Sequence, residues 1–167
     1  VLGTAEGGLV ITLYMVNNLT DKMLTDYATV NDYYFHTMHH EFTHILNQKI
    51  PYDENFQHIS EGNYVSGDWY QKRTSAANKK GFVTPYAMSE PLEDFAEMLS
   101  VYVTTSPSGW QKIMDTAGTT GAPFIQAKLD MVRAYMKNSW KLDIDELRSI
   151  VLRRASEINH LDLNQLK

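Results

Sequence analysis

Apolar side chains recur every three or four residues between positions 33 and 46, which is the spacing that one face of a helix requires. Asp32 is a suitable N-cap before this stretch, and Pro51 stops the pattern a few residues after it. The sequence therefore predicts a helix with one apolar face. The positions that we expect this helix to bury are Phe35, Met38, Phe42, Ile45 and Leu46.

A run of β-prone residues near the start of the chain is the best candidate for a strand. It covers Leu9–Val16, and Asn17 and Asn18 end it. Two interpretations stay open for this strand: it lies in the core, or it lies beside a cleft and pairs with the backbone of a substrate. The small residues at positions 3–8 indicate a flexible segment, and positions 19–31 indicate a short helix or a loop.

The second half of the chain is mainly helical in its pattern. Ser89 and Pro91 begin a helix whose apolar stripe reaches Val103. A short helix over 110–115 ends at Gly118, and two amphipathic helices follow over 123–140 and 143–157. Before these helices, 51–69 and 71–80 read as loops with short elements, and 81–87 reads as an extended segment.

Length and composition support one domain over residues 1–167. The chain has 43% hydrophobic and 21% charged residues, which are values typical of globular domains. We divide it into a strand and helix over 1–50, a second motif segment over 81–103, and C-terminal helices over 107–167. The predicted fold class is α+β, with a small N-terminal sheet packed on the helix around residues 33–46 and a helical C-terminal half.

Charge and cysteine content exclude several functions. The net charge of −5, without a basic block, argues against nucleic acid as a partner. The sequence has no apolar run long enough for a transmembrane segment. Cysteine is absent, so disulfides and thiolate ligands are excluded, and a bound metal must be held by histidine and carboxylate side chains.

The helix predicted around residues 33–46 contains the pattern H-E-x-x-H, as His40, Glu41 and His44. Residues four apart lie on one helix face, so both imidazoles can reach one metal ion. Glu41 projects to the side of that pair, where it can act as a general base on a metal-bound water. Zinc suits this ligand set, and the reaction indicated is amide hydrolysis. The alternative is a core helix with solvated histidines and no metal.

A zinc ion held by two histidines needs a third protein ligand, and carboxylate is a standard choice. Glu90, Glu93 and Glu97 share one face of the helix that begins near Pro91, while Asp94 is turned about 100° from Glu93. Glu93 or Glu97 could supply the ligand, and the other could then accept the N–H of a ligating histidine. A row of solvated acids is the alternative interpretation.

The remaining histidines have weaker claims on the site. The extended motif with a third histidine requires Gly at position 47 and His at position 50, where this chain has Asn47 and Ile50. His58 is therefore expected at the surface or in packing. His36 lies one turn before His40 and is expected to be a polar neighbour of the site.

Together the two motifs resemble those of gluzincins. The block Glu93-Asp94-Phe95-Ala96-Glu97, with Tyr86 seven residues before it, is similar to that of anthrax lethal factor and its relatives. The segment Gly81–Ala87 with this block resembles more closely the bacterial zinc-binding metallopeptidases described as substrate-import-associated zinc metallohydrolase lipoproteins. The resemblance covers about residues 33–103 and implies a zincin-like metallopeptidase domain.

The resemblance also implies a role for each matching residue. His40, His44 and Glu93 would bind Zn²⁺, Glu41 would be the general base, and Glu97 would be the partner of a ligating histidine. Tyr86 would direct its hydroxyl at the oxyanion of the tetrahedral intermediate, although a half-buried packing tyrosine is the alternative. Thr43, where such motifs often have Gly or Ala, and Glu97, where thermolysin-like enzymes have Asp, depart from the pattern.

From these observations we expect a zinc peptidase that acts on a peptide or protein substrate. The alternative is a catalytically inactive zinc-binding accessory or binding module of an outer-membrane nutrient-import system, against which the intact Glu41 argues. Association with such a system, and a periplasmic or cell-surface location, are implied by the resemblance alone. So is a lipid anchor on a segment that preceded Val1.

Overall fold

The computed structural model describes residues 2–24, 26–157 and 160. Near the N-terminus, β1 (Gly3–Glu6) and β2 (Val10–Leu13) form a two-stranded antiparallel sheet in which Gly3 pairs with Leu13 and Glu6 with Val10. Gly7 and Gly8 connect the strands with φ values of 58° and 64°, which residues that have a Cβ rarely adopt. The predicted strand over 9–16 is therefore shorter than expected, and the segment predicted to be flexible supplies its partner.

Helices make up most of the remaining structure, and this confirms the predicted mainly helical α+β class. The helices are α1 (Asp21–Leu24), α2 (Tyr27–Val30), α3 (His36–Lys49), α4 (Asn55–Ile59), α5 (Thr74–Lys79), α6 (Pro91–Thr104), α7 (Pro107–Trp140) and α8 (Ile144–Glu157). Short 3-10 segments lie at η1 (Val16–Asn18), η3 (Ser66–Gln71) and η4 (Tyr86–Met88), and a short π-helical segment lies at η2 (Asn31–Phe35). Among the described residues, no helix is both long and apolar enough to cross a membrane.

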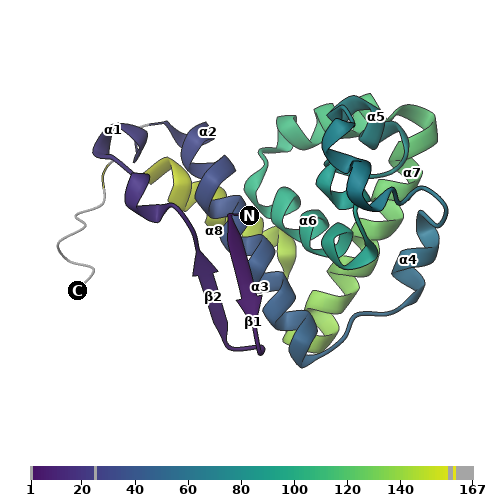
Figure 1. Cartoon of the computed structure of the whole chain (residues 1–167), viewed down its shortest axis with the longest axis horizontal. Helices are drawn as coiled ribbons and strands as arrows, with labels where there is room; N and C mark the ends of the chain where they lie inside the picture. The colour runs from purple at the N-terminus through teal and green to yellow at the C-terminus, as the bar shows by residue number, and fades with distance from the viewer. Residues whose placement is uncertain (1, 25, 158–159, 161–167) are drawn as a thin grey trace.

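Helix α6 lies at the centre of the fold (Figure 1). It contacts α3, α7 and α8, and every residue from Asp94 to Thr104 is buried. A helix surrounded in this way is buried on nearly all sides, so its buried surface is wider than the predicted apolar stripe and includes Asp94 and Glu97. Its Phe95 packs against Phe56 and Tyr135 in the main hydrophobic core.

The two C-terminal helices predicted over 110–115 and 123–140 are joined in the structure. Helix α7 runs from Pro107 to Trp140 and changes direction at Gly118, whose φ of 62° is not helical. The predicted break at Gly118 is therefore a kink, and the second part begins before Pro123.

Helix α3 buries only part of the predicted face, because Leu46 is buried in the core as expected but Met38 and Phe42 are not. Phe42 and Met38 are 42% and 39% exposed, whereas His40, Glu41 and His44 are buried. The reason is that α6 and the hairpin pack on the polar face of α3 (Figure 1). Asp32 is not an N-cap either, because η2 joins α2 directly to α3.

A buried ion pair connects α7 to α6. Lys128 Nζ lies 2.6 Å from Asp94 Oδ2, and both side chains are fully buried. Lys128 also donates to the Gly81 carbonyl at 2.8 Å and lies 3.9 Å from the centre of the Phe82 ring. The Tyr64 hydroxyl donates to the same Asp94 oxygen at 2.9 Å. The pair therefore joins α6 and α7 to Gly81 and Phe82 in the bent segment before η4.

We expect Lys128→Met to destabilise the protein by about 3–5 kcal/mol, because it leaves the Asp94 carboxylate buried without its cation. The free energy of unfolding in urea measures this loss. The double variant Lys128→Met/Asp94→Asn removes both charges and should be clearly more stable than the single variant. Equal stability of the two variants would contradict the importance of the pair.

Candidate metal centre and cleft

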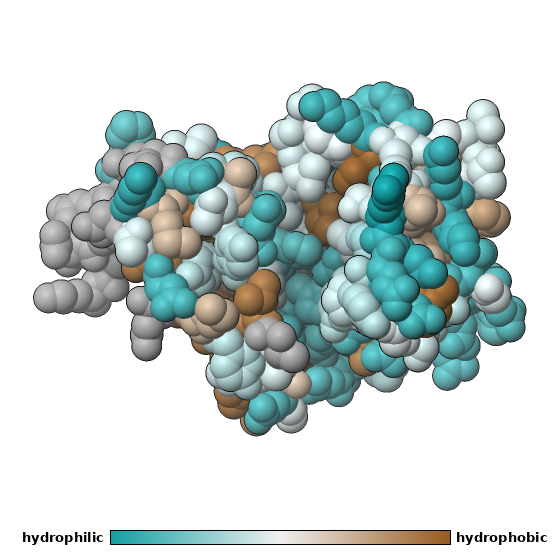
Figure 2. Space-filling model, turned by 45° about the horizontal axis from the view of Figure 1, so that its top comes forward, coloured by the Kyte–Doolittle hydropathy of each residue, from teal (hydrophilic) through white to brown (hydrophobic). Residues whose placement is uncertain are grey.

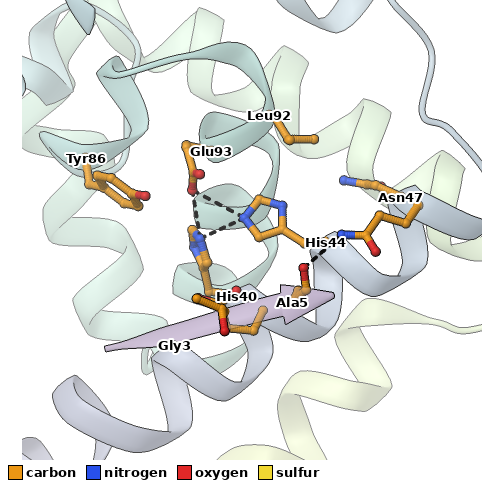
Figure 3. A pocket seen from close by; sticks show the side chains of 11 residues that line it. Gly3, Ala5, His40, His44, Asn47, Tyr86, Leu92 and Glu93 are labelled. Atoms are coloured by element: carbon orange, nitrogen blue, oxygen red, sulfur yellow. Dashed lines mark hydrogen bonds and ion pairs between the residues drawn. The ribbon is translucent and has the colours of Figure 1, made fainter. Parts of the chain in front are cut away.

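Helices α3 and α6 bring His40, His44 and Glu93 together (Figure 3). His40 Nε2 and His44 Nε2 lie 3.0 Å apart. Glu93 Oε2 lies 2.8 Å from His40 Nε2 and 3.3 Å from His44 Nε2. The two histidines lie one turn apart on α3, and Glu93 comes from the first turn of α6. Each of the three sequence-predicted ligands therefore offers one atom to a common point.

These three atoms fit a zinc ion. Ligands about 2.0–2.1 Å from zinc in a tetrahedral arrangement lie about 3.3 Å from one another. The observed separations of 2.8–3.3 Å are close to this value. Burial lowers the pKa of His40, but its hydrogen bonds to Glu93 and Glu97 outweigh burial and raise that pKa to about 10. The surroundings therefore favour a positive charge at this point.

Glu97 lies behind His40 and is 3% exposed. One of its oxygens accepts hydrogen bonds from His40 Nδ1 at 2.8 Å and from His36 Nε2 at 2.9 Å. The other accepts from the Thr84 hydroxyl at 2.6 Å. Burial raises the pKa of Glu97, but His36 and His40 outweigh it and hold that pKa well below its ordinary value. The carboxylate therefore stays ionised and fixes the His40 ring.

His36, His40 and Glu97 form a second group that could hold a metal. This group shares His40 with the first group but uses its Nδ1 atom, which is bonded to Glu97. Each group lines a cavity that Glu41 and Tyr86 also line. The first group, however, joins both histidines of the H-E-x-x-H pattern through their Nε2 atoms, whereas Glu97 of the second group already accepts hydrogen bonds from His36, His40 and Thr84. We therefore take the first group as the metal centre.

Glu41 is buried on α3 and borders the metal centre. Burial raises its pKa, and the neighbouring His40 and His44 offset only part of this rise. Gly3 of β1 packs against it so closely that a Cβ on Gly3 would lie 2.7 Å from Glu41 Cγ and 2.9 Å from Thr37 Cγ2. The first strand therefore forms a wall beside the predicted base.

Tyr86 lies across the metal centre from β1 (Figure 3). Its ring centre is 5.7 Å from that of His40, and the Trp69 ring contacts it edge-on at 4.9 Å. Burial and the charge of Glu93 raise the pKa of the Tyr86 hydroxyl, so it stays protonated near neutral pH. The preceding turn is closed by a hydrogen bond from the Ala87 amide to the Thr84 hydroxyl at 3.1 Å.

Two cavities meet at the metal centre, and both are lined by Gly3, His40, Glu41 and Tyr86. One has a volume of about 420 Å³ and extends along β1 towards Asn47 and Leu92. The other, of about 570 Å³, extends towards His36, Trp69 and Lys72. Figure 2 shows a hollow on this side of the molecule, between the part with the hairpin and the part with α4–α7. The metal centre therefore lies inside a cleft that continues on both sides.

His36 and His58 lie where the sequence suggested. His58 is exposed and contacts Glu61 at 3.2 Å, away from the cleft. His36 is a polar neighbour as predicted, and its bond to Glu97 could have been foreseen from its position one turn before His40.

The sequence did not indicate Thr84 or the wall that β1 forms beside Glu41, because no local pattern links these residues to the two motifs.

The comparisons with known proteins agree with a zinc site. The family described as putative zinc-binding metallo-peptidase matches residues 1–145. A crystal structure of a protein described in the same words, from Bacteroides caccae, has 47% sequence identity and a TM-score of 0.88. The alignment covers 100% of this chain and 63% of that one, so this chain spans less than two thirds of its length. No curated protein matches the chain.

Proposed function

The chain belongs to the family described as putative zinc-binding metallo-peptidases, and from this membership we propose that it hydrolyses peptide bonds by a gluzincin-type mechanism. The observation that carries the proposal is the meeting of three ligand atoms, from His40, His44 and Glu93, beside Glu41 in an open cleft. A buried general base next to a cation site is the arrangement that metal-assisted hydrolysis requires.

Zinc, when bound, lowers the pKa of a coordinated water to about 7 and polarises a carbonyl oxygen. Glu41 accepts a proton from the attacking water and passes it to the nitrogen of the leaving amine. The raised pKa of its carboxyl suits both steps, because a base that is too weak could not accept the proton. Tyr86, which stays protonated, donates its hydroxyl hydrogen to the developing oxyanion.

The first strand suits a peptide substrate. β2 pairs with only one edge of β1, and the cleft is lined by Gly3, Thr4 and Ala5 from that strand. An extended peptide could add to the sheet at this edge by backbone hydrogen bonds. In this proposal β1, and not the strand predicted over 9–16, pairs with the backbone of the substrate. The peptide runs through the cleft on both sides of the metal.

Zinc-loaded protein is expected to digest casein or a mixed peptide library, and metal-stripped protein is not. Return of zinc should restore cleavage, because the His and Glu side chains alone supply no activated water. Mass spectrometry of the fragments measures cleavage. Equal digestion by loaded and stripped protein would contradict the proposal.

Location at the periplasm or cell surface, a lipid anchor, and association with an import system stay predictions from the resemblance. Fractionation of the source cells would test the first of them.

A further inference from the structure

Three buried polar atoms near the metal centre lack a hydrogen-bond partner among the described residues. They are Nδ1 of His44 and both amide atoms of Asn47, Oδ1 and Nδ2. His44 is 8% exposed and Asn47 is 7% exposed. A buried polar atom without a partner costs about 1–3 kcal/mol, so three such atoms at one place call for a physical reason.

The two ligating histidines differ in how their rings are held. His40 uses Nε2 towards the metal centre and Nδ1 towards Glu97, at 2.8 Å. A histidine that binds metal through one nitrogen almost always donates the N–H of the other to an acceptor, which fixes the ring and increases its basicity. His44 has no such acceptor, although its Nε2 atom lies in the same ligand group.

Asn47 is placed to be that acceptor. It lies three residues after His44 on the same buried face of α3, and its side chain points towards His44 in Figure 3. Neither amide atom is hydrogen-bonded to His44 in this structure, so the bond requires a rotation of the Asn47 side chain. A half-turn of the amide exchanges Oδ1 and Nδ2 without changing the side-chain volume and turns the oxygen towards Nδ1. Asn47 borders one end of the cavity, but both of its amide atoms are buried, so they are available to His44 rather than to solvent.

We propose that Asn47 is a positioning residue that accepts the Nδ1–H of His44 and holds that ring for zinc, as Glu97 holds His40. This bond satisfies two of the three atoms. The inference rests on the zinc site of the proposed function, but it does not require that the protein cleave peptides.

Two substitutions separate this role from simple packing. Asn47→Leu keeps a similar volume and removes the acceptor, so the zinc dissociation constant should rise about 10- to 100-fold. Asn47→Asp keeps an acceptor oxygen and should bind zinc about as tightly as the unaltered chain. Competition with a chromophoric chelator measures both constants, and thermal unfolding of the metal-free proteins shows whether each variant folds.

Proton NMR of the zinc-loaded, unaltered protein gives an independent test. The Nδ1–H of His44 should exchange slowly with solvent, and Asn47→Leu should remove this signal. Equal zinc affinity in Asn47→Leu and the unaltered protein, or rapid exchange of the proton, would overturn the inference. Zinc binding without any peptide cleavage would overturn only the peptidase function, whereas no zinc binding would overturn both.

Discussion

Glu41→Gln is expected to reduce peptide hydrolysis by at least about 10²–10⁴-fold, the usual contribution of a general base. The amide has nearly the shape of the carboxylate, but it cannot accept the proton of the attacking water. Glu41 does not belong to the ligand group, so the variant should still bind one zinc per chain. The rate of cleavage of a peptide found in the library digest, with zinc content measured on the same sample, gives the result.

Glu61→Gln is a matched control for this experiment, because it makes the same chemical change at an exposed position outside the cleft. It should leave the cleavage rate unchanged. Full activity in Glu41→Gln would exclude Glu41 as the base, and loss of zinc from that variant would show that its effect is structural.

Glu93→Ala is expected to weaken zinc binding by more than about 100-fold. That is more than the loss of a residue that only supports a ligand usually costs, which is about 10- to 100-fold. The substitution removes one of three ligand atoms and leaves two histidines that hold zinc poorly by themselves. Glu97→Ala should cost less, about 10- to 100-fold, because it removes only the support behind His40. Competition with a chromophoric chelator ranks the variants.

Glu90→Ala serves as the control, since Glu90 is an exposed acid just before the same helix. It should bind zinc as the unaltered chain does. A larger loss in Glu97→Ala than in Glu93→Ala would place the metal in the group of His36, His40 and Glu97 instead. In that case His36→Ala should also abolish binding.

The candidate ligand group could be predicted from sequence because its components are local. The four-residue spacing of His40 and His44 needs only a helix, and the E-x-x-x-E spacing of Glu93 and Glu97 needs only another. The choice between these two acids as the ligand came from the resemblance, and the structure places Glu93 beside the imidazoles and Glu97 behind one of them.

The remaining features of the fold and the cleft depend on contacts between segments that are distant in the sequence, and no periodic pattern indicates such contacts. Met38 and Phe42 have the spacing of a buried face, but α6 covers the opposite, polar face because its carboxylates bond to the histidines there. β1 was missed because its segment is rich in small residues, and pairing with β2 decides its conformation. Lys128 lies in a segment that the sequence predicts as an amphipathic helix, yet it is fully buried. Its burial is possible because it forms an ion pair with Asp94.

Thr84 links the candidate metal centre to the turn that carries Tyr86. Its hydroxyl accepts a hydrogen bond from the Ala87 amide and donates one to Glu97, and Glu97 accepts one from His40, a proposed zinc ligand. By thermodynamic reciprocity, a turn that is ordered in this way favours zinc, and zinc favours the ordered turn to the same extent. In the proposed mechanism, metal loading and the placement of Tyr86 are thus coupled, so that uptake of the metal also stabilises the turn that carries Tyr86.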